Sequence, residues 1–88
     1  MCPNIQRQAP VAGSARSGSG WFRLERARVA YDCPSHASGE HALIVDFVDS
    51  SGGLDRRCVV ELTVDSAREL GEAILAAARE AEAYEAAA

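Results

Sequence analysis

The segment from Arg57 to Val64 limits the fold of this chain most strongly, because its side chains alternate clearly in character. Every second residue is apolar: Cys58, Val60, Leu62 and Val64. The residues of the other parity are Arg57, Val59, Glu61 and Thr63. A period of two predicts a β-strand with one face against a core. A pattern of helical period follows directly, so the sequence predicts a strand that leads straight into a C-terminal helix.

That helix is predicted from Asp65 to about Tyr84. Asp65 is a suitable N-cap, because its carboxylate can accept a hydrogen bond from a free backbone N–H group of the first turn. Apolar residues recur at helical spacing and form one stripe: Ala67, Leu70, Ile74, Ala77 and Ala81, widened by Leu75 and Ala78. Gly71 costs about 1 kcal/mol in a helix interior relative to alanine. It therefore predicts close backbone contact with a strand or a partner.

Two further segments have the character of strands. Residues 21–32 form a strand whose apolar parity changes, which a bulge near Glu25 or Arg26 would explain. Residues 40–48 are apolar on both parities, which is typical of a central strand covered on both sides. Residues 4–11 contain two prolines and form at most an edge strand. Residues 13–20, GSARSGSG, are predicted to be a flexible connection.

The expected fold is therefore a single α+β domain over residues 1–88, a small antiparallel sheet of three to four strands with one C-terminal helix packed on it. Residues 1–20 form an irregular or edge-strand N-terminal segment, residues 21–64 hold the strands, and residues 65–84 form the helix. A chain of 88 residues buries only about 60% of its unfolded surface. Because much of its apolar content is alanine, we expect a thin core and a homodimer.

Charge and hydropathy exclude several functions. The net charge is −4, the chain has no lysine, and its arginines are interleaved with acids, so we expect no nucleic-acid binding. No apolar run approaches the roughly 20 residues of a membrane span. The N-terminus lacks the pattern of a signal peptide. We therefore expect a cytoplasmic protein that does not bind membranes.

The densest group of chemically useful side chains lies between Tyr31 and Asp46. Cys33, His36 and His41 can supply three ligands to one metal ion, with Cys2 as a fourth. Thiolate and imidazole favour a divalent transition metal, above all zinc. Three ligands and a water would form a catalytic type of site, and four a structural one. Glu40 or Asp46 could then transfer protons.

Two alternatives to a metal site remain open for this loop. The first is a metal-free polar pocket, which includes Cys33 acting as a nucleophile activated by a neighbouring histidine. The second is a loop that carries no chemistry. The odd number of cysteines argues against a disulfide framework, and Cys58 has the parity of a core residue.

Four segments together resemble a family of short uncharacterised actinobacterial proteins. They are the Met1-Cys2 start, AGSARSGSGWF at 12–22, YDCPSHASGEHALIVDF at 31–47, and the helix segment SARELGEAILAA. The loop of that family reads approximately F-D-H-P-x-H-A-P-A-E-H-T-L-N-I-D-F. It matches at Asp32, Pro34, His36, Glu40, His41 and Asp46, and departs at Cys33, where the family has histidine. The resemblance implies a bacterial source and a setting in specialised metabolism, and no particular activity.

Two functional hypotheses follow. The leading one is a small transition-metal-binding protein, in its catalytic form a metal-dependent enzyme acting on a small organic molecule. The alternative is a non-catalytic dimeric interaction or accessory module, whose sheet face and alanine-rich helix dock onto a partner.

Overall fold

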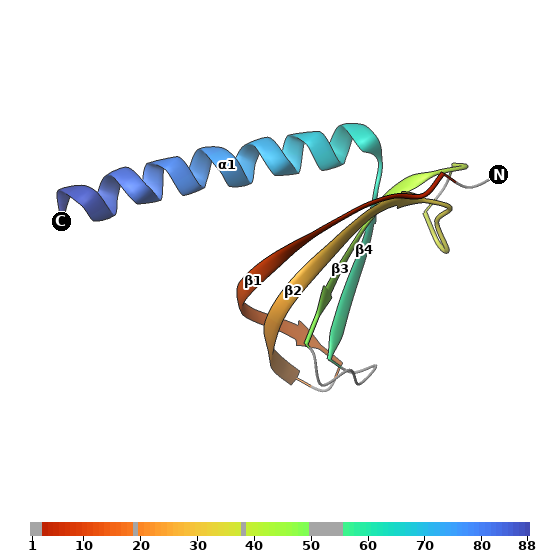
Figure 1. Cartoon of the computed structure of the whole chain (residues 1–88), viewed down its shortest axis with the longest axis horizontal. Helices are drawn as coiled ribbons and strands as arrows, with labels where there is room; N and C mark the ends of the chain where they lie inside the picture. The colour runs from red at the N-terminus through yellow and green to blue at the C-terminus, as the bar shows by residue number, and fades with distance from the viewer. Residues whose placement is uncertain (1–2, 19, 38, 50–55) are drawn as a thin grey trace.

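The computed structural model describes residues 3–18, 20–37, 39–49 and 56–88. The chain forms four strands, β1 (Ile5–Ser17), β2 (Gly20–Asp32), β3 (Ala42–Val48) and β4 (Arg57–Leu62), and then one helix, α1 (Val64–Ala87). The strands lie side by side in chain order, and each neighbouring pair is antiparallel (Figure 1). The predicted α+β class, an antiparallel sheet with one C-terminal helix, is confirmed.

β1 is an edge strand that is longer than expected. The flexible connection predicted from Gly13 onward is wrong, because Gly13–Ser17 pairs with the first residues of β2 to form a long hairpin. Backbone pairing in the hairpin outweighs the weak strand preference of glycine and serine. The register shifts between Pro10 and Gly13. Three steps along β1 there oppose two along β2, so the extra residue lies in β1, opposite the predicted bulge.

The strand register divides the sheet into two chemically different faces. Residues directly opposite one another share a face, and alternate residues along each strand return to it. The apolar face carries three residues each from β2, β3 and β4: Ala27, Val29, Tyr31, Leu43, Val45, Phe47, Cys58, Val60 and Leu62. The other face, called the polar face here, carries Arg26, Arg28, Ala30, Asp32, Ile44, Asp46, Arg57, Val59 and Glu61, together with the buried Ala42 and Val48.

The buried core is small. Among the described residues the buried apolar side chains are Phe22, Leu24, Ala27, Ala42 and Val48, and none of the large side chains is less than 2% exposed. β1 also contacts β4, so the far end of the long hairpin curls toward the opposite edge of the sheet (Figure 1). The described part of the chain therefore has a thin core, as the alanine content predicted.

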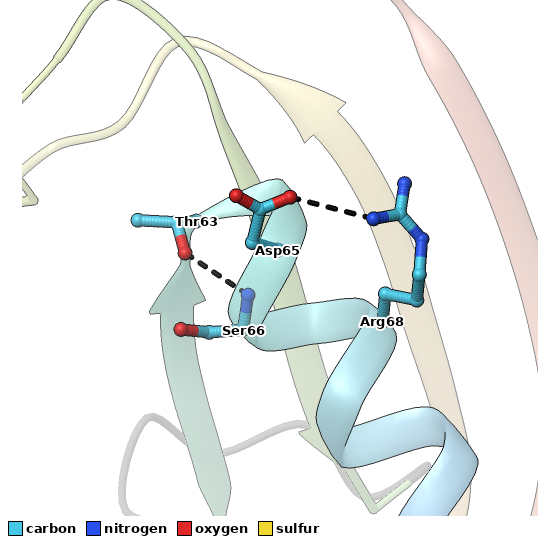
Figure 2. A network of polar contacts seen from close by, with 4 residues as sticks. All are labelled: Thr63, Asp65, Ser66 and Arg68. Atoms are coloured by element: carbon cyan, nitrogen blue, oxygen red, sulfur yellow. Dashed lines mark hydrogen bonds and ion pairs between the residues drawn. The ribbon is translucent and has the colours of Figure 1, made fainter.

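α1 begins at a threonine cap. The Thr63 hydroxyl accepts a hydrogen bond from the backbone N–H of Ser66 at 3.1 Å (Figure 2). The predicted N-cap, Asp65, lies instead inside the first turn and forms an exposed ion pair with Arg68 at 3.4 Å. A threonine hydroxyl satisfies the free N–H group as an aspartate would, so the helix starts one residue earlier and continues to Ala87. No helix in the described part of the chain has the length and apolar character to cross a membrane.

The helix does not lie along the sheet. It leaves the end of β4, contacts β3 near its start, and runs away from the strands (Figure 1). No residue of α1 is buried. A Cβ atom built on Gly71 would meet no atom within 4 Å. The chain alone therefore does not provide the packing that was expected for the apolar stripe.

Candidate functional site

A carboxylate on β4 holds the loop between β2 and β3. Glu61 accepts three backbone hydrogen bonds, from the N–H groups of Ser35 at 2.6 Å, His36 at 2.8 Å and Ala37 at 2.8 Å. These bonds favour the ionised form, so they lower the pKa of Glu61, with the bond from Ser35 making the largest contribution. Glu61 therefore fixes the loop that was predicted to carry the metal ligands.

An ion pair crosses the polar face beside this loop. The Arg57 Nε donates to the Asp46 Oδ1 at 2.8 Å. Asp46 is only 6% exposed, so its charge needs this partner. The hydrogen bond to Asp46 raises the pKa of the Arg57 guanidinium. Asp46, a predicted proton-transfer residue, is thus held in an ion pair on the central strand.

Hollows open on the polar face within the described part of the chain. One hollow, of about 600 Å³, is lined by Ser35, His36, Ala37, Arg57, Val59 and Glu61. A second, of about 240 Å³, lies between β1, β2, β3 and β4, and Arg57 lines both. The first hollow is where the structure could accommodate a small molecule. Sequence reasoning missed its two principal charged residues, Arg57 and Glu61, because only strand pairing brings them beside the loop.

The predicted metal ligands are spread over this region. His36 is exposed at the first hollow, whereas half-buried His41 packs against Tyr31, with ring centroids 5.5 Å apart. Glu40 is exposed in the loop. Within the described residues, no group of three or more His, Cys, Asp or Glu side chains is arranged to hold a metal ion.

The bonding state of Cys33 differs from the prediction. Cys33 is disulfide-bonded, although the odd cysteine count argued against such bonds. An odd count leaves one thiol over and does not prevent a single pair from forming. Cys58 has a free thiol, half-buried on the apolar face. The prediction for Cys2 lies outside the described residues. A disulfide sulfur is not a thiolate, so Cys33 could act as a metal ligand only after reduction.

A second candidate site is apolar and involves the helix. Leu70, Ile74 and Leu75 are 49%, 59% and 56% exposed. On the apolar face of the sheet, Val60 is 37% exposed, and Ala27 is the one buried residue among the nine. Isolated apolar side chains on a surface are common, but contiguous apolar surfaces of this kind typically mark interaction sites. The helix stripe and the apolar face are therefore candidate binding surfaces.

The fold and these surfaces define a small α+β domain, a four-stranded antiparallel meander followed by a projecting helix. The chain belongs to DUF6295, a family of unknown function whose model matches residues 1–87. No curated protein and no solved structure matches the chain.

Proposed function

We propose that this protein is a non-catalytic interaction module, which binds another polypeptide through the apolar stripe of α1 and the apolar face of its sheet. One observation carries the proposal: α1 has 24 residues, and none of them is buried. Isolated helices are marginally stable in water, and most helices in proteins are stabilised by packing of an apolar face. Because the apolar stripe of α1 is not buried within its own chain, we expect it to pack against a partner.

The first test compares two substitutions on the same helix. Ile74→Glu places a charge in the stripe, whereas Ala76→Glu places the same charge on another side of the helix, two residues further on. In a lysate of the native host, tagged wild-type protein should sediment as an assembly larger than one chain. Ala76→Glu should preserve that assembly and Ile74→Glu should reduce it to the monomer. An assembly that survives Ile74→Glu would contradict the proposal.

A transition-metal site stays the competing prediction. Its ligands would be Cys33, His36 and His41, with Cys2 as a fourth, and Glu40 or Asp46 would transfer protons. The test is elemental analysis of fully reduced protein after dialysis against zinc, with His36→Ala as the ligand variant and Ser35→Ala as its neighbour control. Stoichiometric zinc that is lost only in His36→Ala would support a metal function. Reduced protein without zinc would end that prediction.

The setting in bacterial specialised metabolism, the actinobacterial origin and a location in the cytoplasm stay part of the proposal. They rest on the loop motif, the composition and the charge of the chain rather than on a site geometry. In such a setting, an interaction module of this size would act as an accessory subunit.

A further inference from the structure

We infer that the partner is a second copy of this chain, and that α1 of each copy lies on the apolar sheet face of the other. This inference rests on the proposed function and names the polypeptide that is bound. It joins two surfaces that a single chain leaves uncovered, the stripe of α1 and the apolar face of β2, β3 and β4. Since both surfaces belong to one chain, two copies can satisfy both at once in a closed two-fold assembly.

The shape of the stripe suits a flat partner. Its apolar and small residues recur at alternating spacings of three and four: Ala67, Leu70, Ile74, Ala77, Ala81 and Tyr84. Gly71 and Ala78 flank this row and allow close approach, and the space beside Gly71 is open. The opposing sheet surface is a regular block of three residues on each of three strands. A narrow stripe of apolar and small residues can therefore lie against a regular sheet surface.

Charge decides between helix on sheet and helix on helix. α1 contains six carboxylates and two arginines, a net charge of −4. The hairpin of β1 and β2, residues 5–32, contains five arginines and two carboxylates, a net charge of +3. Arg7, opposite Val29, and Arg23, which has the parity of Ala27, lie on the side of the apolar face, whereas Arg26 and Arg28 lie on the polar face. Two helices of the same charge repel each other, whereas a helix on the partner's sheet is attracted to the basic hairpin.

The area reaches the lower limit of a specific interface. From Ala67 to Tyr84 the stripe is about 27 Å long and about 10 Å wide, from the helical rise and diameter. Each of the two helix-on-sheet contacts buries this area once on the helix and once on the sheet. The dimer therefore buries on the order of 1,000 Å² in total, which is about the smallest area of a specific interface. In the dimer, each chain then has a second apolar layer in addition to its small core, formed by its apolar sheet face and α1 of the other copy.

The first experiment measures the mass of the purified protein in solution. Sedimentation from low micromolar concentrations upward should give twice the mass of one chain for the wild type and for Ala76→Glu. Ile74→Glu should give the mass of a single chain, with circular dichroism to show that its sheet is retained. A wild-type monomer at all concentrations would overturn the second-copy inference. The interaction module would survive that result if the lysate assembly still depended on Ile74.

The second experiment identifies the surface that the stripe touches. The photoreactive residue p-benzoylphenylalanine replaces Ile74, and this protein is mixed with isotope-labelled wild type, so that intermolecular products can be recognised by mass. Crosslinks to labelled peptides of β2, β3 or β4 are expected, and the same residue at position 76 should give none. Crosslinks to labelled α1 would overturn the helix-on-sheet arrangement and indicate helix pairing. Crosslinks only within one chain would overturn the inference that α1 lies on the sheet of the other copy.

Discussion

A single carboxylate on an edge strand organises the loop that precedes β3. Glu61 receives backbone N–H groups from three consecutive residues, Ser35, His36 and Ala37. Consecutive N–H groups that converge in this way form a concave anion-binding arrangement. Here the anion is part of the chain, so the loop is fixed to β4 without a ligand. His36 is placed at the hollow as a result.

Glu61→Gln should loosen this loop while leaving the sheet intact. The amide replaces one acceptor oxygen by an NH₂ group, which would face a backbone donor instead of accepting from it. Hydrogen exchange of the amides of Ser35, His36 and Ala37 should become several-fold faster. Glu40→Gln is the matched control, since Glu40 is an exposed carboxylate in the same loop. Unchanged exchange in Glu61→Gln would mean that these bonds do not hold the loop.

The same bonds predict a dependence on pH. The pKa of Glu61 is lowered below its ordinary value of 4.5 by the three backbone donors. A lowered folded-state pKa stabilises the protein fully above that ordinary value and loses its contribution as the pH falls through the folded value. The carboxyl carbon shift of Glu61, followed by NMR, should therefore change with a midpoint below that ordinary value. A midpoint at or above the ordinary value would mean that the three backbone donors do not stabilise the carboxylate.

Neither Glu61 nor Arg57 could be recognised as a site residue from the sequence. In β4 they occupy the polar parity of an alternating strand, a position that is usually only solvated. Their roles come from residues 11 to 26 positions away, Asp46 and the loop at Ser35 to Ala37. The sequence did place His36 in a loop between two strands. It could not show that His36 and His41 have different surroundings.

At the scale of elements, prediction succeeded where a local pattern is strong. The alternation in β4 and the apolar run in β3 each gave a strand, and the row from Ala67 to Ala81 gave the helix. It failed for Gly13–Ser17, where glycine and serine indicate a loop and only pairing with β2 makes a strand. The helix boundary was also displaced, because threonine and aspartate are both good caps and lie two residues apart.

Thr63→Ala should weaken the start of α1. The hydroxyl bond to the N–H of Ser66 is lost, and removal of such a cap costs about 1 kcal/mol. The control is Asp65→Ala, which removes an exposed ion pair at 3.4 Å, a kind of contact that contributes little. Urea unfolding of both variants gives the comparison. If Asp65→Ala lowered the free energy of unfolding more than Thr63→Ala, the N-cap would be Asp65 and not Thr63.

Gly71→Ala should affect the free chain and the assembly in opposite directions. In the free chain the added methyl group meets open space, so the helix gains about 1 kcal/mol in propensity. In the proposed dimer Gly71 borders the contact, and the methyl group holds the two copies apart. We expect higher helicity at high dilution and a higher dissociation constant by sedimentation. An unchanged dissociation constant would place Gly71 outside the interface.

At the scale of the whole molecule, two regions of opposite charge and two uncovered apolar surfaces occur in one chain of 88 residues. The buried apolar side chains among the described residues are Phe22, Leu24 and three smaller ones, Ala27, Ala42 and Val48. Folded proteins are stable by a narrow margin, and small domains bury the smallest share of their surface. The alanine content of the sequence predicts such a small core. The projection of α1 away from the sheet could not be anticipated, since an apolar stripe looks the same in sequence whichever chain covers it.

Assembly and folding should consequently be linked. If the dimer supplies much of the apolar burial, the thermal unfolding midpoint rises with protein concentration, because association stabilises the folded state by mass action. Ile74→Glu should remove this dependence and lower the midpoint at high concentration, whereas Ala76→Glu should keep it. Differential scanning calorimetry over a wide concentration range measures both. A midpoint independent of concentration in a wild type shown to be dimeric would mean that the dimer dissociates into folded monomers before they unfold, and that the helix exchange contributes little to folding.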